Sequence, residues 1–429
     1  MFKTSLALIF AVVFASHAQL LTSRFTTSFY GWQGIDSARS STLYARGYEQ
    51  VHLNIANEQF QFLTNFQVSN DFGTAIASDP ELRIPSLMVK GNNIGGVADI
   101  SVGRQFVYAG VGSGIMDGYL VERKFFDNTF GITAYGGLNV IRTRDWNLNQ
   151  SLTDNSMYGA LLSYSPIENG AIGISYISKL WKRESYSGIR PNLADSSFDP
   201  QYVVFYSRPN EEEFTSIDLL YDSPESFNVY ARSDYDMIGE KFSRAQISAK
   251  YFVVKNLSIA ADYLFHEPRL AYNSIFSVFN FGSTKELEGS VEYQILPKTR
   301  LFARFANVSY VDDNSQRLSI GGMYDFLTFN YTKNFGYAGD LNGINVFAVY
   351  PLQDLLLTPS VGFGYASYKL SKEAPSNSVL SLLAGVTYRP MKMLMTDFQL
   401  QWMNNPQFKN DLRVFIKASY YLSDKLNLL

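Results

Sequence analysis

Apolar and polar residues alternate one by one along most of the chain, and this period of two is typical of β-strands with two different faces. In LEGSVEYQ at 287–294, Leu287 and Val291 lie on one face, and Glu288 and Glu292 lie on the other. Past residue 20, no segment is as long and apolar as a membrane-spanning helix. The chain is therefore expected to be all-β. Similar alternation recurs at 246–251, 380–389 and 412–420.

Ten tight connections join the predicted strands in pairs, and an aromatic residue repeatedly lies beside the turn. Longer and more polar segments, such as 182–213 and 266–283, separate the pairs. One end of the sheet is therefore expected to carry short turns and the other long loops. Counting the first and last strands, the pairs predict 22 strands, and 16 to 22 fit the length. The tight connections lie near Ala56, Asn92, Asp127, Pro166, Pro224, Lys255, Pro297, Phe326, Leu352 and Met391.

The apolar faces of so many strands must be covered, either by another layer of protein or by membrane lipid. Soluble sheets rarely grow past about ten strands without splitting. Aromatic residues make up 15% of the chain and charged residues 17%, below the roughly 25% charge of soluble domains. An antiparallel up-and-down barrel that spans an outer membrane explains the aromatic turns, the unequal loops and the alternation together. A secreted propeller or β-solenoid is the alternative, although the strand spacing is variable and no motif repeats at a fixed period.

The first 18 residues have the pattern of a secretory signal peptide. Lys3 precedes the apolar run 5–14, and small residues at 16–18 predict cleavage before Gln19. Residues 19–429 then form a single barrel domain. The chain has no cysteine, which excludes disulfides and thiolate metal sites. Its net charge of −3 offers no basic surface for nucleic acid.

The chain resembles the general outer-membrane porins of Gram-negative bacteria, including the carbohydrate- and anion-passing kinds. The resemblance rests on the signal peptide, the aromatic-turn-aromatic hairpins, and VGRQF (102–106) followed by glycines and Asp117-Gly118. It implies an outer-membrane location, contact with lipid and the barrel assembly machinery, and passive passage of small hydrophilic solutes. It is also compatible with a homo-oligomer. Such barrels usually end on an aromatic residue, whereas this chain continues past Tyr421 to Leu429.

The most glycine-rich stretch is 101–118, with glycines at 110, 112 and 114. Ile115 and Asp117 break the dinucleotide-binding spacing, and no helix is expected to follow. A bulge at Gly103 would turn Arg104 from the lipid side to the lumen. Gly110, Gly112 and Gly114 would then form a compact external loop that narrows the pore mouth or is a plain tight loop.

The polar faces predict a lumen of mixed charge. Arg300, Arg304 and Arg317 fall on adjacent strands and form either a selectivity ladder or cross-strand pairs with Glu288 and Glu292. On this pairing Arg317 has no acidic partner. The full set of predicted pore-lining residues is Arg104, Asp117, Lys250, Asp262, Glu288, Glu292, Arg300, Arg304, Arg317, Arg413 and Lys417.

Enzymatic chemistry has little support in the sequence. After the signal peptide the only histidines are His52 and His266, and no nucleophile motif or metal-ligand spacing is present. No cofactor and no metal are therefore expected. A barrel hydrolase active at the rim, with His266 and Glu267, is a weaker alternative. The stronger one is a substrate-specific or surface-binding barrel, closed by inward folding of 182–213.

Overall fold

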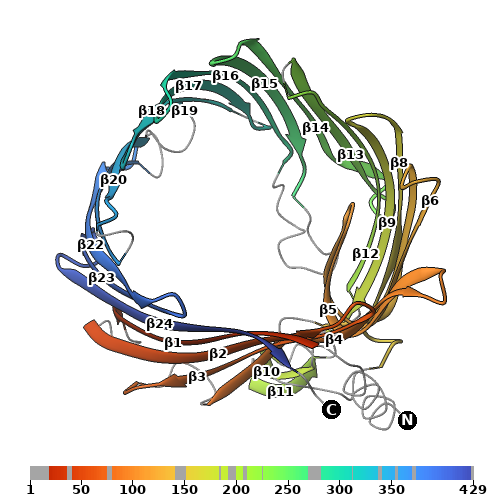
Figure 1. Ribbon diagram of the computed structural model, residues 1–429. Coiled ribbons are helices and arrows are strands. Elements are labelled where there is room, and N and C mark those ends of the chain that lie inside the picture. The colour runs from red at the N-terminus through yellow and green to blue at the C-terminus, as the bar shows by residue number, and fades with distance from the viewer. Residues whose placement is uncertain are drawn as a thin grey trace.

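A computed structural model places the chain in a closed β-barrel, viewed nearly along its axis in Figure 1. A single sheet of 22 strands forms the wall, and β1 (Gln19–Ile35) pairs with both β2 (Ser41–Ala56) and β24 (Asp411–Leu426). Each strand of the sheet pairs antiparallel with its neighbours in sequence, except that β12 follows β9. The expected all-β, up-and-down barrel and the count of 22 strands are confirmed.

The other strands of the wall, with the separate two-stranded pair β10–β11, have the following bounds. They are β3 (Phe60–Asp71), β4 (Glu81–Ile94), β5 (Ala98–Ala109), β6 (Gly112–Phe125), β7 (Phe130–Asn139), β8 (Ser156–Ile167), β9 (Gly170–Trp181), β10 (Tyr186–Pro191), β11 (Pro200–Phe205), β12 (Asn210–Asp222), β13 (Phe227–Asp236), β14 (Lys241–Val254), β15 (Leu257–His266), β16 (Thr284–Leu296), β17 (Thr299–Ser309), β18 (Asn314–Tyr324), β19 (Leu327–Gly336), β20 (Leu341–Val349), β21 (Leu357–Tyr368), β22 (Asn377–Met391) and β23 (Leu394–Asn404).

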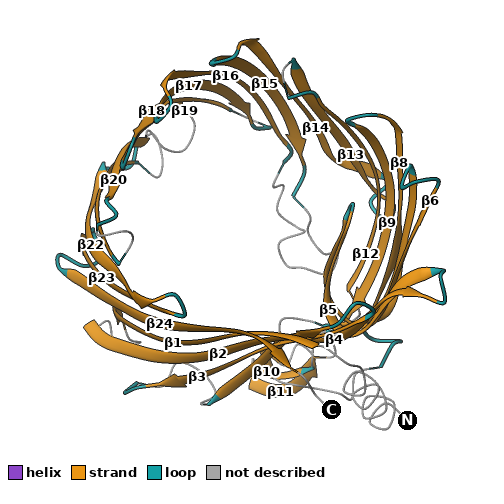
Figure 2. Cartoon of the chain, viewed as in Figure 1, coloured by secondary structure: helices purple, strands orange, loops and turns teal. Residues whose placement is uncertain are grey.

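The described part of the chain is nearly all strand, with short turns between strands (Figure 2). Within it, no helix is long and apolar enough to cross a membrane. The predicted signal peptide, 1–18, lies outside the described residues. These residues are 19–35, 41–74, 80–140, 151–182, 185–191, 200–205, 210–224, 226–268, 282–311, 313–336, 341–352, 356–369 and 373–426.

All ten predicted tight connections join consecutive strands at one end of the barrel, here called the turn end; the opposite end is the loop end. The first and last strands also meet at the turn end, where Gln19 is paired with Leu426. Residues 422–426 continue the last strand and complete the pairing with β1. They are therefore part of the seam that closes the barrel.

The two faces of the wall keep their character from strand to strand. Across β14, β15 and β16, Ile247, Tyr263 and Leu287 are paired in one row and point outward. The adjacent row, which includes Asp262 and Glu288, points to the lumen. Because paired residues of antiparallel strands share a face, the period-two sequence pattern becomes an apolar exterior and a polar interior.

Candidate pore lining and inner hairpin

The tip of the β5–β6 hairpin leaves the wall. Pairing of β5 with β4 ends at Arg104, and pairing of β6 with β7 begins at Met116, but β5 and β6 stay paired with each other as far as Ala109 and Gly112. In Figure 1, β5 lies inside the ring, next to β12. Residues 105–115, here called the inner hairpin, therefore occupy part of the lumen.

A row of three glycines lies where the inner hairpin begins. Gly103 is opposite Gly118, which is opposite Gly137 on β7. Gly103 has φ +120°, and a Cβ there would lie 2.3 Å from the carbonyl oxygen of Leu87. A Cβ at Gly118 would lie 2.2 Å from the carbonyl oxygen of Gly136. Only glycine fits where backbones approach this closely, so the row acts as a crease in the sheet.

One face of the inner hairpin packs against the inside of the wall. Val107 of the inner hairpin is fully buried, as are Met116, the residue just after the hairpin, and Met157 on β8. These residues belong to a contiguous apolar cluster that fixes the hairpin on strands β7, β8, β9 and β12. The remaining buried members of the cluster are Ala109, Val111, Tyr135, Ile177 and Phe214.

Two hydrogen bonds hold the hairpin tip to β9. The backbone N–H of Val111 donates to Oγ of Ser175 at 2.8 Å, and Nζ of Lys179 donates to the carbonyl oxygen of Ser113. Both bonds join the tip to the inner face of the wall. The tip is therefore held by polar as well as apolar contacts.

The opposite face of the inner hairpin is open to the lumen. Phe106 and Tyr108 are 61% and 76% exposed, whereas their neighbour Val107 is fully buried. Ile115 and Ser113 are paired with these aromatic residues and share their face. Because the hairpin has folded over the inside of the wall, the face that would have met the exterior now points into the lumen.

The expected geometry of the glycine stretch is wrong in two respects. Gly110 lies in a two-residue turn with Val111, but Gly112 and Gly114 lie in β6, so the three glycines form no compact external loop. No register shift occurs at Gly103, so it is not a bulge. The sheet folds instead of changing phase.

Arg104 and Asp117 lie just beyond the crease. Nε and Nη2 of Arg104 each donate to one carboxylate oxygen of Asp117 at 2.7 Å, and Nη1 donates to the carbonyl oxygen of Ile84 at 3.3 Å. Ile84 belongs to β4 beyond the last pair with β5, so the guanidinium partners a carbonyl on that free strand edge. The Arg104 side chain is only 8% exposed.

Most of the other predicted pore-lining charges form ion pairs on the inner face. Glu292 lies 3.1 Å from Arg300 and 3.8 Å from Lys250. At the seam, Arg413 lies 2.9 Å from Asp411 and Lys417 lies 3.0 Å from Asp397. Asp262 is paired in register with Glu288, with no ion pair to a described residue. The lining therefore carries both signs of charge in short range of each other.

The expected partners within the arginine ladder are partly wrong. Arg317 binds Glu286 and Glu288, with 2.9 Å between its Nη2 and the Glu288 carboxylate. Arg304 has no carboxylate partner among the described residues, and its guanidinium lies 4.9 Å from the Phe302 ring centre. Glu288 on β16 therefore does not neutralise the charge of Arg304 on β17. It pairs instead with Arg317 on β18, the next strand along the wall.

A buried charge network at the loop end was missed in the sequence. Arg46 on β2 lies 2.8 Å from Glu81 and 3.4 Å from Asp71, and all three are less than 9% exposed. Arg46 and Asp71 are directly opposite on β2 and β3. Counting outward from the tight turn near Ala56 would have paired them. Among the described residues, no group of three histidine, cysteine or acidic side chains is arranged to hold a metal.

The described part of the 182–213 connection contains the hairpin β10–β11. Its strands pair only with each other. Figure 1 shows this hairpin beyond β2–β4, on the far side of the wall from the lumen. The element seen inside the ring is the inner hairpin, whereas the described strands of 182–213 lie outside it.

Comparisons with known proteins show the fold and no family. No protein-family model and no curated protein matches the chain. The chain is similar to an E. coli P pilus tip assembly intermediate, PapC-PapD-PapK-PapG, at 10% identity and TM-score 0.51, over 94% of this chain and 60% of that one. The chain is also similar to a P pilus usher (PapC) translocation pore, at 8% identity and TM-score 0.47, over 94% of this chain and 99% of that one. A BenF-like porin from Pseudomonas fluorescens is similar at 10% identity and TM-score 0.42, over 96% of this chain and 100% of that one.

Proposed function

We propose that the protein is an outer-membrane barrel that gives small hydrophilic solutes passive passage through its lumen. The observation that carries this proposal is the separation of faces around the closed ring. Large apolar side chains are exposed on the outside along many strands, for example Leu287, Phe305 and Val361 at 60%, 49% and 58%. Such a continuous apolar surface greatly exceeds what soluble monomers expose, whereas lipid accommodates it.

The inner face supports an aqueous lumen. Its ion pairs and polar rows would be costly against hydrocarbon, and they are arranged where water can solvate them. The turn end, which holds both ends of the described chain, would face the periplasm, as short turns do in such barrels. The lumen would conduct both ions and neutral solutes, because neither sign of charge dominates its lining.

We further propose that the inner hairpin is the constriction of the pore. It occupies lumen cross-section, is fixed by the apolar cluster, and presents Phe106 and Tyr108 to passing solute. The narrowing of the pore that was expected from a loop at Gly110, Gly112 and Gly114 is thereby assigned to the hairpin that contains them. Arg104 and Asp117 act at its base as a brace, not as a freely solvated charge pair.

Conductance in planar bilayers tests the proposal. Folded protein should give discrete channels, and replacing residues 106–115 with a two-residue Asn-Gly turn between the paired Gln105 and Met116 should raise the single-channel conductance while the barrel still folds. Replacing the same number of residues in the β10–β11 hairpin should leave conductance unchanged. Folded protein without channels in either form would favour a closed, surface-binding barrel.

A further inference from the structure

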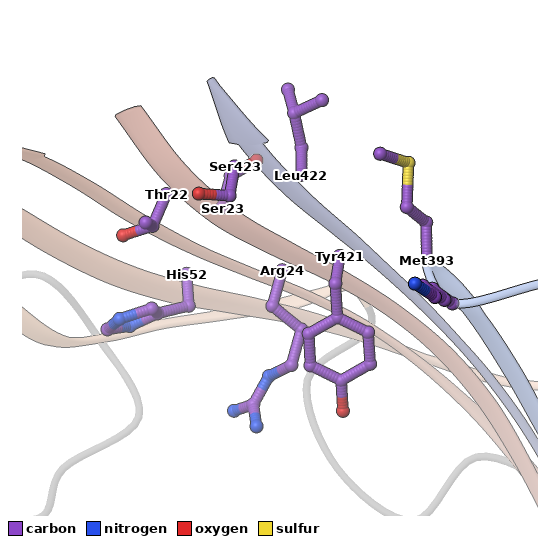
Figure 3. A pocket seen from close by; sticks show the side chains of 9 residues that line it. Thr22, Ser23, Arg24, His52, Met393, Tyr421, Leu422 and Ser423 are labelled. Atoms are coloured by element: carbon purple, nitrogen blue, oxygen red, sulfur yellow. The ribbon is translucent and has the colours of Figure 1, made fainter. Parts of the chain in front are cut away.

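Four basic side chains gather at the turn end of the lumen, outside the ion pairs described above. Arg24 on β1 is directly opposite His52 on β2 and opposite Tyr421 on β24. Figure 3 shows the side chains of Arg24, His52 and Tyr421 pointing to the same side of the sheet, with Arg24 between the other two. The register places all three in the row that faces the lumen.

Tyr421 lines two open pockets. The first, of about 500 Å³, is lined by Arg24, His52 and Tyr421, which Figure 3 labels, and by Lys392. The second, of about 710 Å³, is lined by Arg389, Lys392 and Tyr421. Because the pockets share Lys392 and Tyr421, the four basic groups line two adjoining open pockets. Either volume is sufficient for a small organic anion.

Among the described residues these four basic groups have no carboxylate partner, a property that they share with Arg304 but not with most lumen cations. Lys250, Arg300 and Arg317 each lie within 4 Å of a glutamate. Among the described residues, neither Arg24 nor Arg389 has an ion pair, and the same holds for His52 and Lys392. A group of like charges without compensation raises the local concentration of counter-ions, most strongly where the surrounding wall has a low dielectric constant.

We propose that this cluster is a binding site for small multivalent anions that carry carboxylate or phosphate groups. Arginine and lysine are donors only, and the Tyr421 hydroxyl can donate as well, so several donors line these adjoining pockets. A multivalent oxyanion spreads its acceptor oxygens over several ångströms and can accept from donors on different strands, whereas chloride is a single small atom with one charge. The site lies at the turn end of the lumen, where it would select anions at one mouth.

Equilibrium dialysis tests the site directly, with radiolabelled citrate, neutral detergent and low salt. Saturable binding is expected and should weaken as salt is added. Arg24→Gln and Lys392→Gln should each lower citrate affinity by about three- to fivefold, the range of one exposed charge pair. Arg24→Lys keeps the charge and should retain most of the affinity. The matched control Lys409→Gln removes the same charge at the loop end and should change nothing.

The proposal rests on the lumen being accessible to solute, as the proposed function requires, and a second measurement separates the two. In a phosphatidylcholine bilayer, citrate on one side should reduce chloride current more than on the other, and Lys392→Gln should weaken that block. Channels without citrate binding or block would overturn the site and leave the pore. Variant-sensitive citrate binding without channels would overturn the pore and leave the site. Equal binding by wild type, Arg24→Gln and Lys392→Gln would overturn the site in either case.

Discussion

The guanidinium of Arg104 binds both carboxylate oxygens of Asp117 at the line where the inner hairpin leaves the wall, through two hydrogen bonds of 2.7 Å. From Gln105 to the tip of the hairpin, β5 is no longer paired with β4. The ion pair therefore lies where the β4–β5 hydrogen bonds end. The third hydrogen bond of Arg104, to the carbonyl oxygen of Ile84, links the pair to β4.

Breaking this pair should destabilise the barrel. Asp117→Asn removes the carboxylate charge that binds a largely buried guanidinium, and breaking such a buried pair costs about 3–5 kcal/mol in comparable proteins. Urea unfolding in detergent, followed by tryptophan fluorescence, measures the change. The double variant Arg104→Met with Asp117→Leu should recover much of the loss, because it removes both charges. A single variant as stable as wild type would show that the pair contributes little.

The glycine crease predicts a contrast between two Gly→Ala variants. Gly118→Ala places a methyl group against the backbone of β7 and should cost about 1–3 kcal/mol or release the inner hairpin. Gly289→Ala on β16 is the control, since a Cβ there meets no atom within 4 Å. It should be neutral or stabilising by up to about 1 kcal/mol. Comparable losses in both variants would contradict the crease.

The apolar cluster predicts that Met157 anchors the inner hairpin. Met157→Ala should cost about 2–5 kcal/mol, part of it as local opening of the tip. Hydrogen exchange at the Val111 amide should become faster, because its bond to Ser175 depends on that packing. Met323→Ala, at a methionine that is 43% exposed, should cost less than about 0.5 kcal/mol. Unchanged exchange at Val111 would mean that the tip is held elsewhere.

The arginine ladder predicts that Arg304 affects mainly the ion selectivity of the pore, whereas Arg317 affects both selectivity and the stability of the barrel. Arg304→Gln should shift the reversal potential in a salt gradient towards cations with little loss of stability, because Arg304 has no carboxylate partner among the described residues. Arg317→Gln should shift it in the same direction but also destabilise the wall, since Glu286 and Glu288 lose their shared cation. Both shifts should grow at low salt, as the Debye length rises from about 10 Å at 0.1 M to about 30 Å at 0.01 M.

Two consecutive residues on β23 test which face meets lipid. Leu400 points outward, and its neighbour Gln399 points to the lumen. Leu400→Arg should lower the free energy of unfolding in phospholipid vesicles by about 2–4 kcal/mol if it lies near mid-bilayer, whereas Gln399→Arg should have a small effect. Similar penalties would mean that the barrel does not cross the bilayer with this face.

The regular part of this fold could be predicted from the sequence because it repeats. Each tight connection is flanked by strands whose apolar residues must share one face, so the positions of Lys255 and Pro297 determine the pairing of β14 to β17. Ten such turns determine the number of strands, and closure follows from the cost of free edges in hydrocarbon.

The inner hairpin could not be predicted in the same way, because its alternation is that of a wall strand. Val107 and Tyr108 alternate as expected, but folding at the crease exchanges which of them meets protein and which meets the lumen. Gly118 and Gly137 indicate the crease only when they are seen to be opposite each other on β6 and β7. An analysis of one strand at a time does not bring them together. Likewise, the partner of Arg317 lies two strands away on β16, so pairing across one turn overlooked it.

The pairing of Gln19 with Leu426 has a consequence for connectivity. Because the ends of the described chain are neighbours in the wall, the barrel has no structural beginning. Joining these ends with a short linker and opening the chain at another exposed tight turn, such as 297–298, would leave every strand with the same two neighbours. The seam at β1 and β24 is thus one of 22 equivalent joints, and circularly permuted chains should close into the same barrel.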